Sequence, residues 1–196
     1  MTPRAILLSA GLCVAAIAAN AASAPPPAAI RGPDPTEMLN FGAWTVRCFP
    51  VQSGAPCDMA QESSNQQTKQ RLVLVSLAYV PAQNRYAATI VTPLGVQLPA
   101  GLIIASGDYK SPALTFRRCE DDGCYVEAAI DNAIMEKLSQ GGKSVLNVTM
   151  FGGGGIALPL SLDGFVPALN TMRRLTAEKL APPSASPATA APARRR

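Results

Sequence analysis

Cys119 and Cys124 lie close together in the stretch FRRCEDDGCYVE, and thiols at such a spacing can catalyse redox exchange, bind a metal or form a structural disulfide. A redox pair prefers two intervening residues and a neighbouring positive charge or helix N-terminus that lowers a thiol pKa. Here four residues, 120–123, intervene, and three of them carry carboxylates that Arg117 and Arg118 offset only in part. The spacing therefore favours a structural disulfide over redox catalysis.

Metal binding at these cysteines would need further ligands in a suitable pattern. The chain contains no histidine, so a zinc site would have to bring two cysteine pairs together as thiolates. Glu120, Asp121 and Asp122 offer oxygen ligands, but three adjacent acids lack the alternating spacing of a calcium loop. We therefore expect no metal and no other cofactor, and we interpret the acidic segment as a solvated turn.

The absence of histidine also limits catalysis, because it excludes the Ser-His-Asp and Cys-His nucleophile systems. Paired carboxylates or a serine-lysine arrangement would remain, and Asp58 with Glu62 or Asp131 with Glu136 could form such carboxylate pairs. Nothing around them in the sequence indicates a perturbed pKa, so we interpret these acids as surface charges. We predict no catalytic residue and expect a protein that is not an enzyme.

Glycines 152–155 follow a strand-like segment and raise the question of a phosphate-binding loop. They lack the GxxxxGK[ST] spacing by which such loops hold phosphates. The run instead predicts a flexible hairpin connection.

Residues 1–24 have the composition of a secretory signal peptide: Arg4 precedes an apolar run, and small residues follow it. The run is shorter than the roughly 20 residues that span a bilayer. We therefore expect cleavage after Ala21 or Ala24 and no transmembrane helix in the mature chain. The predicted location is the periplasm or outer envelope, or outside the cell.

Export changes what the other cysteines indicate, because thiols tend to pair in oxidising compartments. The mature chain keeps Cys48, Cys57, Cys119 and Cys124, for which three pairings are possible. The two short intervals favour Cys48 with Cys57 and Cys119 with Cys124, although spacing alone does not decide the pairing. Loop-closure arithmetic gives about 2 to 3 kcal/mol for each of these two disulfides.

Composition divides the mature chain into three parts. Residues 25–35 are proline-rich, and residues 181–196 carry no large apolar side chain, so both are predicted to be disordered. Residues 36–180 are long enough for a single domain with its own core. They contain 12 Lys and Arg against 12 Asp and Glu, so the body is neutral and the positive charge lies at the basic tip, 194–196. We expect no nucleic-acid binding.

The dominant periodicity in the body is two, which indicates strands with one buried face. Residues 72–80 are apolar on both faces and predict a central strand. A connection of hairpin length joins them to a further strand over 85–92. Four other segments alternate apolar with polar residues: 44–48, 124–130, 146–150 and 156–162.

Two short helices are predicted beside the strands. Asp131 is a good N-cap for a helix over residues 132–139, and Gly141 is placed to end it. A second helix is expected to start near Asp163 or Gly164. Many short strands with few helices predict a mainly β protein, either a β-sandwich or a barrel-like antiparallel sheet, with local disulfides.

The expected hairpin around Cys119 and Cys124 contains a conflict of register. We predict a four-residue loop, 120–123, in which Gly123 adopts a positive φ. If the two cysteines are directly opposed, Val126 shares a face with Arg117 rather than with the apolar residue beside it. Either a bulge next to the disulfide or burial of both faces would resolve this conflict.

Several stretches together resemble one protein family. They are FGAWTVRC at 41–48 with the second cysteine at 57, TPLGVQLPAGL at 92–102, FRRCEDDGC at 116–124, DNAIMEKLSQGG at 131–142, and IALPLSLDGF at 156–165. In this order they resemble the invasion-associated locus B (IalB) family of exported alphaproteobacterial proteins, over roughly residues 41–175. The resemblance implies an all-β, disulfide-containing protein of the periplasm or outer envelope, linked in some pathogens to host-cell entry. It supplies no catalytic residue.

These observations lead to one main hypothesis and one alternative. We expect an exported envelope protein that acts by binding or structural support, with an envelope or host-surface component as its partner. The alternative is a periplasmic thiol-disulfide helper that uses Cys119 and Cys124. The two hypotheses differ in the reduction potential that they require of this cysteine pair.

Overall fold

The computed structural model describes residues 33–50 and 52–182. The predicted signal peptide, residues 1–24, lies outside the described residues, as does most of segments 25–35 and 181–196. The predictions made for these segments therefore stay predictions. Within the described part of the chain, no helix is both long enough and apolar enough to cross a bilayer.

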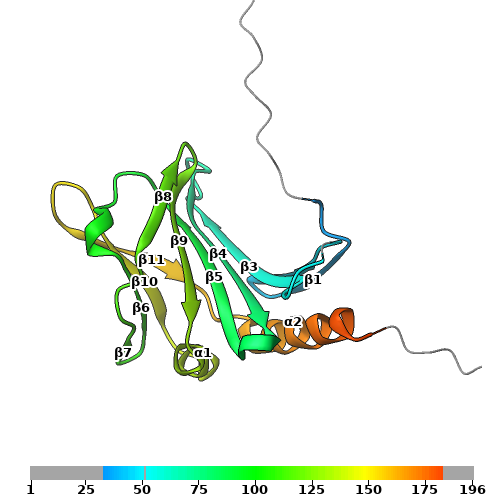
Figure 1. Ribbon diagram of the computed structural model, residues 1–196. Coiled ribbons are helices and arrows are strands. Elements are labelled where there is room, and N and C mark those ends of the chain that lie inside the picture. Colours follow the sequence, from blue (N-terminus) through cyan, green and yellow to red (C-terminus); the bar gives the residue numbers. More distant parts are fainter. Residues whose placement is uncertain (1–32, 51, 183–196) are drawn as a thin grey trace, which may run out of the picture. The chain divides into compact units, whose positions relative to one another are not determined.

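Seven antiparallel strands form the larger of two sheets, in the order β1-β2-β3-β4-β5-β9-β8 (Figure 1). The first five strands are joined in succession, each to its neighbour in the sheet. The middle strand is β4, which confirms the central strand predicted from an apolar segment. The bounds are β1 Glu37–Phe41, β2 Trp44–Cys48, β3 Cys57–Ser64, β4 Arg71–Val80, β5 Arg85–Thr92, β8 Phe116–Glu120 and β9 Gly123–Ile130.

Four antiparallel strands form the smaller sheet, in the order β11-β10-β6-β7. The connection between β10 and β11 contains Gly152, Gly153 and Gly154, all at positive φ, so the predicted hairpin connection is confirmed. Short 3-10 turns, η1 over Pro81–Gln83 and η2 over Leu98–Ala100, follow β4 and precede β6. The strand bounds are β6 Leu102–Ser106, β7 Tyr109–Lys110, β10 Ser144–Thr149 and β11 Gly155–Leu160.

Both predicted helices are present. Helix α1 spans Asn132–Ser139 with Asp131 at its N-cap, where the backbone oxygen of Asp131, rather than its carboxylate, accepts a hydrogen bond from the Ile134 N–H at 3.1 Å. Helix α2 spans Phe165–Leu180 after Gly164, as expected. With 16 residues it is longer than the short helix predicted.

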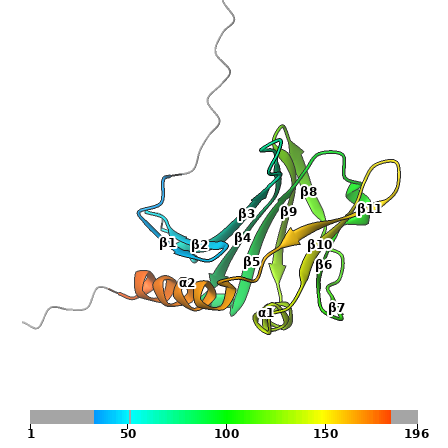
Figure 2. The ribbon, with the colours of Figure 1, turned by 180° about the vertical axis from the view of Figure 1, so that it is seen from behind.

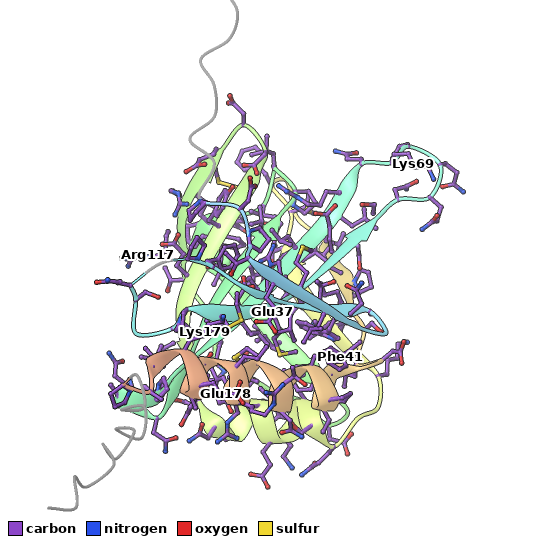
Figure 3. All side chains as sticks on the ribbon, turned by 90° about the vertical axis from the view of Figure 1, so that its right-hand side faces the viewer. Glu37, Phe41, Lys69, Arg117, Glu178 and Lys179 are labelled. Atoms are coloured by element: carbon purple, nitrogen blue, oxygen red, sulfur yellow. A yellow bond between two sulfur atoms is a disulfide. The ribbon has the colours of Figure 1, made fainter. Side chains whose placement is uncertain are left out.

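The core lies between the two sheets and beneath α2. Figures 1 and 2 show α2 running along the β1–β4 half of the large sheet, and α2 contacts each of these four strands. Its buried side chains include Phe165, whose ring meets Trp44 of β2 edge-on at 5.3 Å between centroids. Lys179, near the end of α2, lies 3.5 Å from the carboxylate of Glu37 on β1 (Figure 3).

The architecture is therefore mainly β, with two separate antiparallel sheets, two helices and two local disulfides. Of the two architectures predicted, the sandwich is the one observed. Alternation correctly placed the buried positions of β2, β9 and β10, each of which has a neighbouring strand on both sides.

One position on β11 differs from the expected alternation. Ile156 is 37% exposed, although its place in the pattern predicts burial. The reason is its position at the end of the sheet: Ile156 pairs with Val148, the residue at which the pairing of β10 with β6 ends. Leu158 and Leu160, further along the strand, are buried as predicted.

Candidate functional site

The structure joins the four mature cysteines into two disulfides, Cys48 with Cys57 and Cys119 with Cys124. These are the pairings that the short intervals favoured. In each case the two residues are directly opposed on neighbouring antiparallel strands, with Cα atoms 4.0 Å apart. Each disulfide therefore reinforces one strand pair rather than joining distant parts of the chain.

The register around Cys119 and Cys124 contains a bulge. Phe116 pairs with Val126, whereas Arg118 pairs with the adjacent Tyr125, so Arg117 is an extra residue on β8. The extra residue returns Phe116 to the core, where it is 7% exposed. Of the two explanations that the sequence left open, the bulge is the one observed.

The turn between β8 and β9 is tighter than predicted. Glu120 pairs with Gly123, so only Asp121 and Asp122 form the turn, and the expected four-residue loop is wrong. The strands continue past the disulfide because the opposed cysteines keep them in register to the last pair. Gly123 does adopt a positive φ, 151°.

Gly123 is also required by a close approach to β5. A Cβ atom at position 123 would lie 2.4 Å from the backbone oxygen of Thr92. The Thr92 hydroxyl donates to the backbone oxygen of Cys124 at 3.3 Å. The hairpin is therefore held against β5 by contacts that leave no room for a side chain at residue 123.

The charged side chains next to the Cys119–Cys124 disulfide form ion pairs with one another. Arg118 donates to the carboxylates of both Glu127 and Glu120, and these hydrogen bonds, that to Glu127 first, raise the pKa of its guanidinium above the ordinary value. The same guanidinium lies 4.3 Å from the centroid of the Tyr125 ring. Since Arg118 is already shared between two carboxylates, it offers little extra stabilisation to a thiolate.

The acidic turn is likewise engaged. Arg71 of β4 donates to Asp122 at 2.8 Å, and the Tyr125 hydroxyl donates to the same carboxylate. These hydrogen bonds, that from Arg71 first, lower the pKa of Asp122. Burial, followed by the neighbouring Asp122 carboxylate, raises the pKa of Tyr125. The ion pair between Asp122 in the turn and Arg71 therefore ties the hairpin to β4.

The Cys48–Cys57 disulfide has different surroundings, since both of its residues are at most 1% exposed. The adjacent rung of the same strand pair carries Arg47 opposite Asp58, and two hydrogen bonds of 2.9 and 2.5 Å join them. Ser76 on β4 donates to Asp58 at 2.7 Å. The β2–β3 pair is therefore held by a disulfide on its buried face and an ion pair on its outer face.

The carboxylates considered for catalysis do not form the pairs considered. Asp58 is bound by Arg47 and Ser76, and Glu62 lies four residues along the same strand, about 13 Å away at 3.3 Å per residue. Asp131 caps α1, and Glu136 lies in that helix. The interpretation of Asp58 as a simple surface charge needs correction, because it takes part in a partly buried hydrogen-bond network.

Sequence reasoning missed a second cluster, where the start of α2 meets the β1–β2 turn. The side-chain amide of Gln61 both donates to and accepts from the backbone of Ser161, at 3.0 and 2.9 Å, and the Trp44 indole donates to the same Ser161 oxygen. Gln61 is 3% exposed. A Cβ at Gly164 would lie 1.9 Å from the backbone oxygen of Phe41. The sequence did offer one signal of this contact, the glycines next to aromatic residues in FGAW and DGF, which permit a close approach of the two backbones.

The fold and the site together define a β-sandwich reinforced by two cross-strand disulfides, with α2 packed on one half of the large sheet. A family profile described as "Invasion associated locus B (IalB) protein" matches residues 44–173. That match covers more than half of the chain, so the chain belongs to the IalB family.

Individual relatives agree with this assignment. The chain is 29% identical over 150 residues to invasion protein B homologs from two strains of Brucella abortus, covering 76% of this chain and 86% of each relative. The crystal structure of invasion associated protein b from Bartonella henselae matches with a TM-score of 0.65 at 23% identity. That match covers 73% of this chain and 99% of the Bartonella chain and shows that the fold is shared.

Proposed function

We propose that this chain is an exported protein of the cell envelope that acts by binding or structural support rather than by catalysis. The observation that carries this proposal is the pair of cross-strand disulfides in one body. Disulfides persist in exported proteins and are rare in the cytosol. The composition of residues 1–24 supports the same location.

Two observations favour binding or support over catalysis. The IalB family is not a known enzyme family. The charged groups nearest the disulfides are engaged with one another, as Asp58 is with Arg47 and Asp122 with Arg71. Charged groups that are paired in this way reinforce strand pairs. A catalytic acid, base or nucleophile instead needs an atom that can reach the substrate.

The location is tested by fractionating cells that express the chain and alkylating free thiols before lysis. We expect the protein in the periplasmic or outer-envelope fraction, with all four of Cys48, Cys57, Cys119 and Cys124 protected from alkylation. A cytosolic protein with free thiols at these positions would contradict the proposal. The mass of the recovered chain also shows whether cleavage follows Ala21 or Ala24.

The partner is sought by crosslinking in intact envelopes, followed by capture and mass spectrometry. The matched control is a chain that ends at Leu180, which keeps all of α2 and lacks the basic tip. The relatives are named for invasion, and on that basis host-surface components are included among the candidates. Enzyme-like turnover of an ester, thiol or glycan substrate that one substitution abolishes would overturn the non-catalytic proposal.

A second candidate function is a thiol-disulfide helper, favoured by the exposure of Cys119. This residue is exposed and its partner Cys124 is buried, so one sulfur can be attacked from solvent. The reduction potential of this disulfide separates the two functions. A value near about −270 to −120 mV, the range of known oxidoreductases, favours the helper, whereas one below about −300 mV indicates a structural disulfide.

A further inference from the structure

Phe151 is the most exposed large apolar side chain among residues 33–50 and 52–182, with 86% of its surface accessible. It lies in the glycine-rich connection between β10 and β11. Three other apolar side chains of this region are also exposed: Leu94 at 51%, Leu98 at 41% and Ile156 at 37%. We refer to Leu94, Leu98, Phe151 and Ile156 as the apolar tip.

Backbone hydrogen bonds hold the two parts of the apolar tip together. The Phe151 N–H donates to the oxygen of Gly95, and the Gln97 N–H donates to the oxygen of Thr149, both at 2.7 Å. Between them, Val96 and Met150 form a β-bridge. Segment 93–98 and the β10–β11 hairpin therefore form one unit, at the end of the fold away from α2 in both ribbon views (Figures 1 and 2).

The same two parts of the chain carry no charge. Residues 86–107 contain no Asp, Glu, Lys or Arg, and neither do residues 144–162. The nearest charged groups that share a surface depression with the tip are Asp121 and the Arg71–Asp122 ion pair, on the Leu94 side. The apolar tip is thus uncharged, and the Arg71–Asp122 ion pair borders it on the Leu94 side.

Packing within the fold does not explain Phe151. The three following glycines, 152–154, have nothing within 4 Å of the position of a Cβ atom, so the connection extends away from the body. An aromatic ring that is almost fully accessible contributes little to the core. Exposed apolar groups gathered at one place commonly mark a contact surface.

We propose that the apolar tip docks on the surface of a lipid bilayer, with Phe151 entering the boundary between headgroups and acyl chains. A protein partner is disfavoured because the tip projects from the body, whereas a protein interface needs a complementary surface packed as densely as a protein interior. A bilayer accepts a projecting apolar ring without a matching pocket. Attraction to anionic lipid is not required, since the tip carries no positive charge.

The proposal depends on export only in that an envelope location would supply the bilayer. Its test uses purified protein and vesicles, so the two proposals fail separately. A chain found in the cytosol would contradict the proposed location, and an exported chain that ignores vesicles would contradict the docking proposal alone.

The experiment is flotation of the purified protein, from whichever cell fraction holds it, with phosphatidylcholine vesicles, comparing the unsubstituted chain with Phe151→Ser. All variants are recovered in the same way and their masses measured, so that they share one N-terminus. We expect Phe151→Ser to lower the vesicle partition constant, obtained from the bound fraction over a range of lipid concentrations, about tenfold or more, the factor that burial of one Phe side chain supplies. Met38→Ser is the matched control, because Met38 is 57% exposed but lies on β1. It should leave binding unchanged.

A second variant reports the contact directly. Phe151→Trp should show a blue shift of its fluorescence when vesicles are added, over the constant signal of the fully buried Trp44. Binding should persist in about 1 M salt, where charges are screened beyond about 3 Å. Matching unfolding temperatures show that the variants fold.

Four results would overturn the proposal. They are failure of the unsubstituted chain to float, equal binding by Phe151→Ser, binding that needs phosphatidylglycerol and is lost in salt, and a dimer that Phe151→Ser abolishes. The last would assign the tip to a second copy of this chain.

Discussion

Cys48–Cys57 and Cys119–Cys124 each join directly opposed residues of neighbouring strands, yet their surroundings differ. Both residues of the first pair are buried in the core beside Met59 and Val46, whereas Cys119 of the second is exposed at the end of a hairpin. The loops that they close are of similar length, with separations of 9 and 5 residues. The entropic contributions are therefore close, about 2 to 3 kcal/mol each. What distinguishes the two disulfides is what surrounds the sulfur atoms.

Both strand pairs carry an ion pair beside the disulfide, Arg47–Asp58 in β2–β3 and Arg118–Glu127 in β8–β9, and only the hairpin is also tied to β4 by an ion pair. The β2–β3 pair carries its disulfide within the core and the Arg47–Asp58 ion pair on the adjacent rung. The β8–β9 hairpin lies at the edge of the sheet, and its disulfide is followed at once by the turn. The hairpin gains further support from Arg71 on β4, which binds Asp122.

The largest expected effect is removal of the buried disulfide. Cys48→Ala with Cys57→Ala should lower the free energy of unfolding by about 4 kcal/mol, because lost packing adds to the lost loop constraint. The matched variant, Cys119→Ala with Cys124→Ala, should lose about 2 kcal/mol. Chemical denaturation measures both. Equal losses would show that burial of the sulfur atoms does not distinguish the two disulfides.

The two disulfides should also differ in their rates of reduction, with the exposed one reduced first. A small thiol can attack the exposed Cys119 directly, whereas attack on Cys48 or Cys57 requires local unfolding. We expect the Cys119–Cys124 disulfide to open about 100-fold faster, measured by alkylation and mass spectrometry during mild reduction. Each double alanine variant gives the rate of the other disulfide alone. Simultaneous opening of both would mean that global unfolding controls reduction.

Gly123 tests the contact between the hairpin and β5. Gly123→Ala should cost about 3 kcal/mol, because the new methyl group would meet the Thr92 oxygen at 2.4 Å. Gly107→Ala is the control: it also has a positive φ, 56°, but nothing lies within 4 Å. It should cost about 1 kcal/mol from backbone strain alone. Thermal unfolding of the two variants measures the difference, and equal losses would show that the hairpin moves freely to admit a side chain.

These expected effects also mark how far the sequence alone could lead. The apolar character of both faces of residues 72–80 placed β4 at the centre, and cysteine spacing favoured both disulfides, because each depends on residues near one another in the chain. Local signals likewise located α1, through Asp131 and Gly141. The expectation for Ile156 failed because its exposure depends on where a strand of another segment ends.

The missed contacts are long-range. Gln61 and Ser161 are 100 residues apart, and no local pattern links a buried amide to a particular backbone group. The turn at Asp121 and Asp122 was predicted too long because its length depends on how many strand pairs form beyond the opposed cysteines, and one further pair, Glu120 with Gly123, is present. The bulge at Arg117 was left open for the same reason, since its position depends on which residues of β9 lie opposite.

The smallest expected effect concerns the ion pair that holds the hairpin from outside. The hydrogen bond from Arg71 lowers the pKa of Asp122 in the folded chain, so its contribution is present above the unfolded pKa, about 3.9, and is lost as pH falls through the lower folded pKa. Because the side chain of Asp122 is 50% exposed, screening keeps this contribution below about 1 kcal/mol. Asp122→Asn should therefore be slightly less stable than the unsubstituted chain at neutral pH and equally stable in strong acid.

The measurement is the free energy of unfolding of both proteins from pH 7 to about pH 2, the span over which an ion-paired Asp titrates. The matched control is Asp108→Asn, an exposed acid for which no ion pair is present among residues 33–50 and 52–182. It should show no comparable difference at neutral pH. A gap for Asp122→Asn that widens as pH falls would have the wrong sign for this ion pair and would assign the support of the exposed hairpin to its disulfide and to the contact with β5.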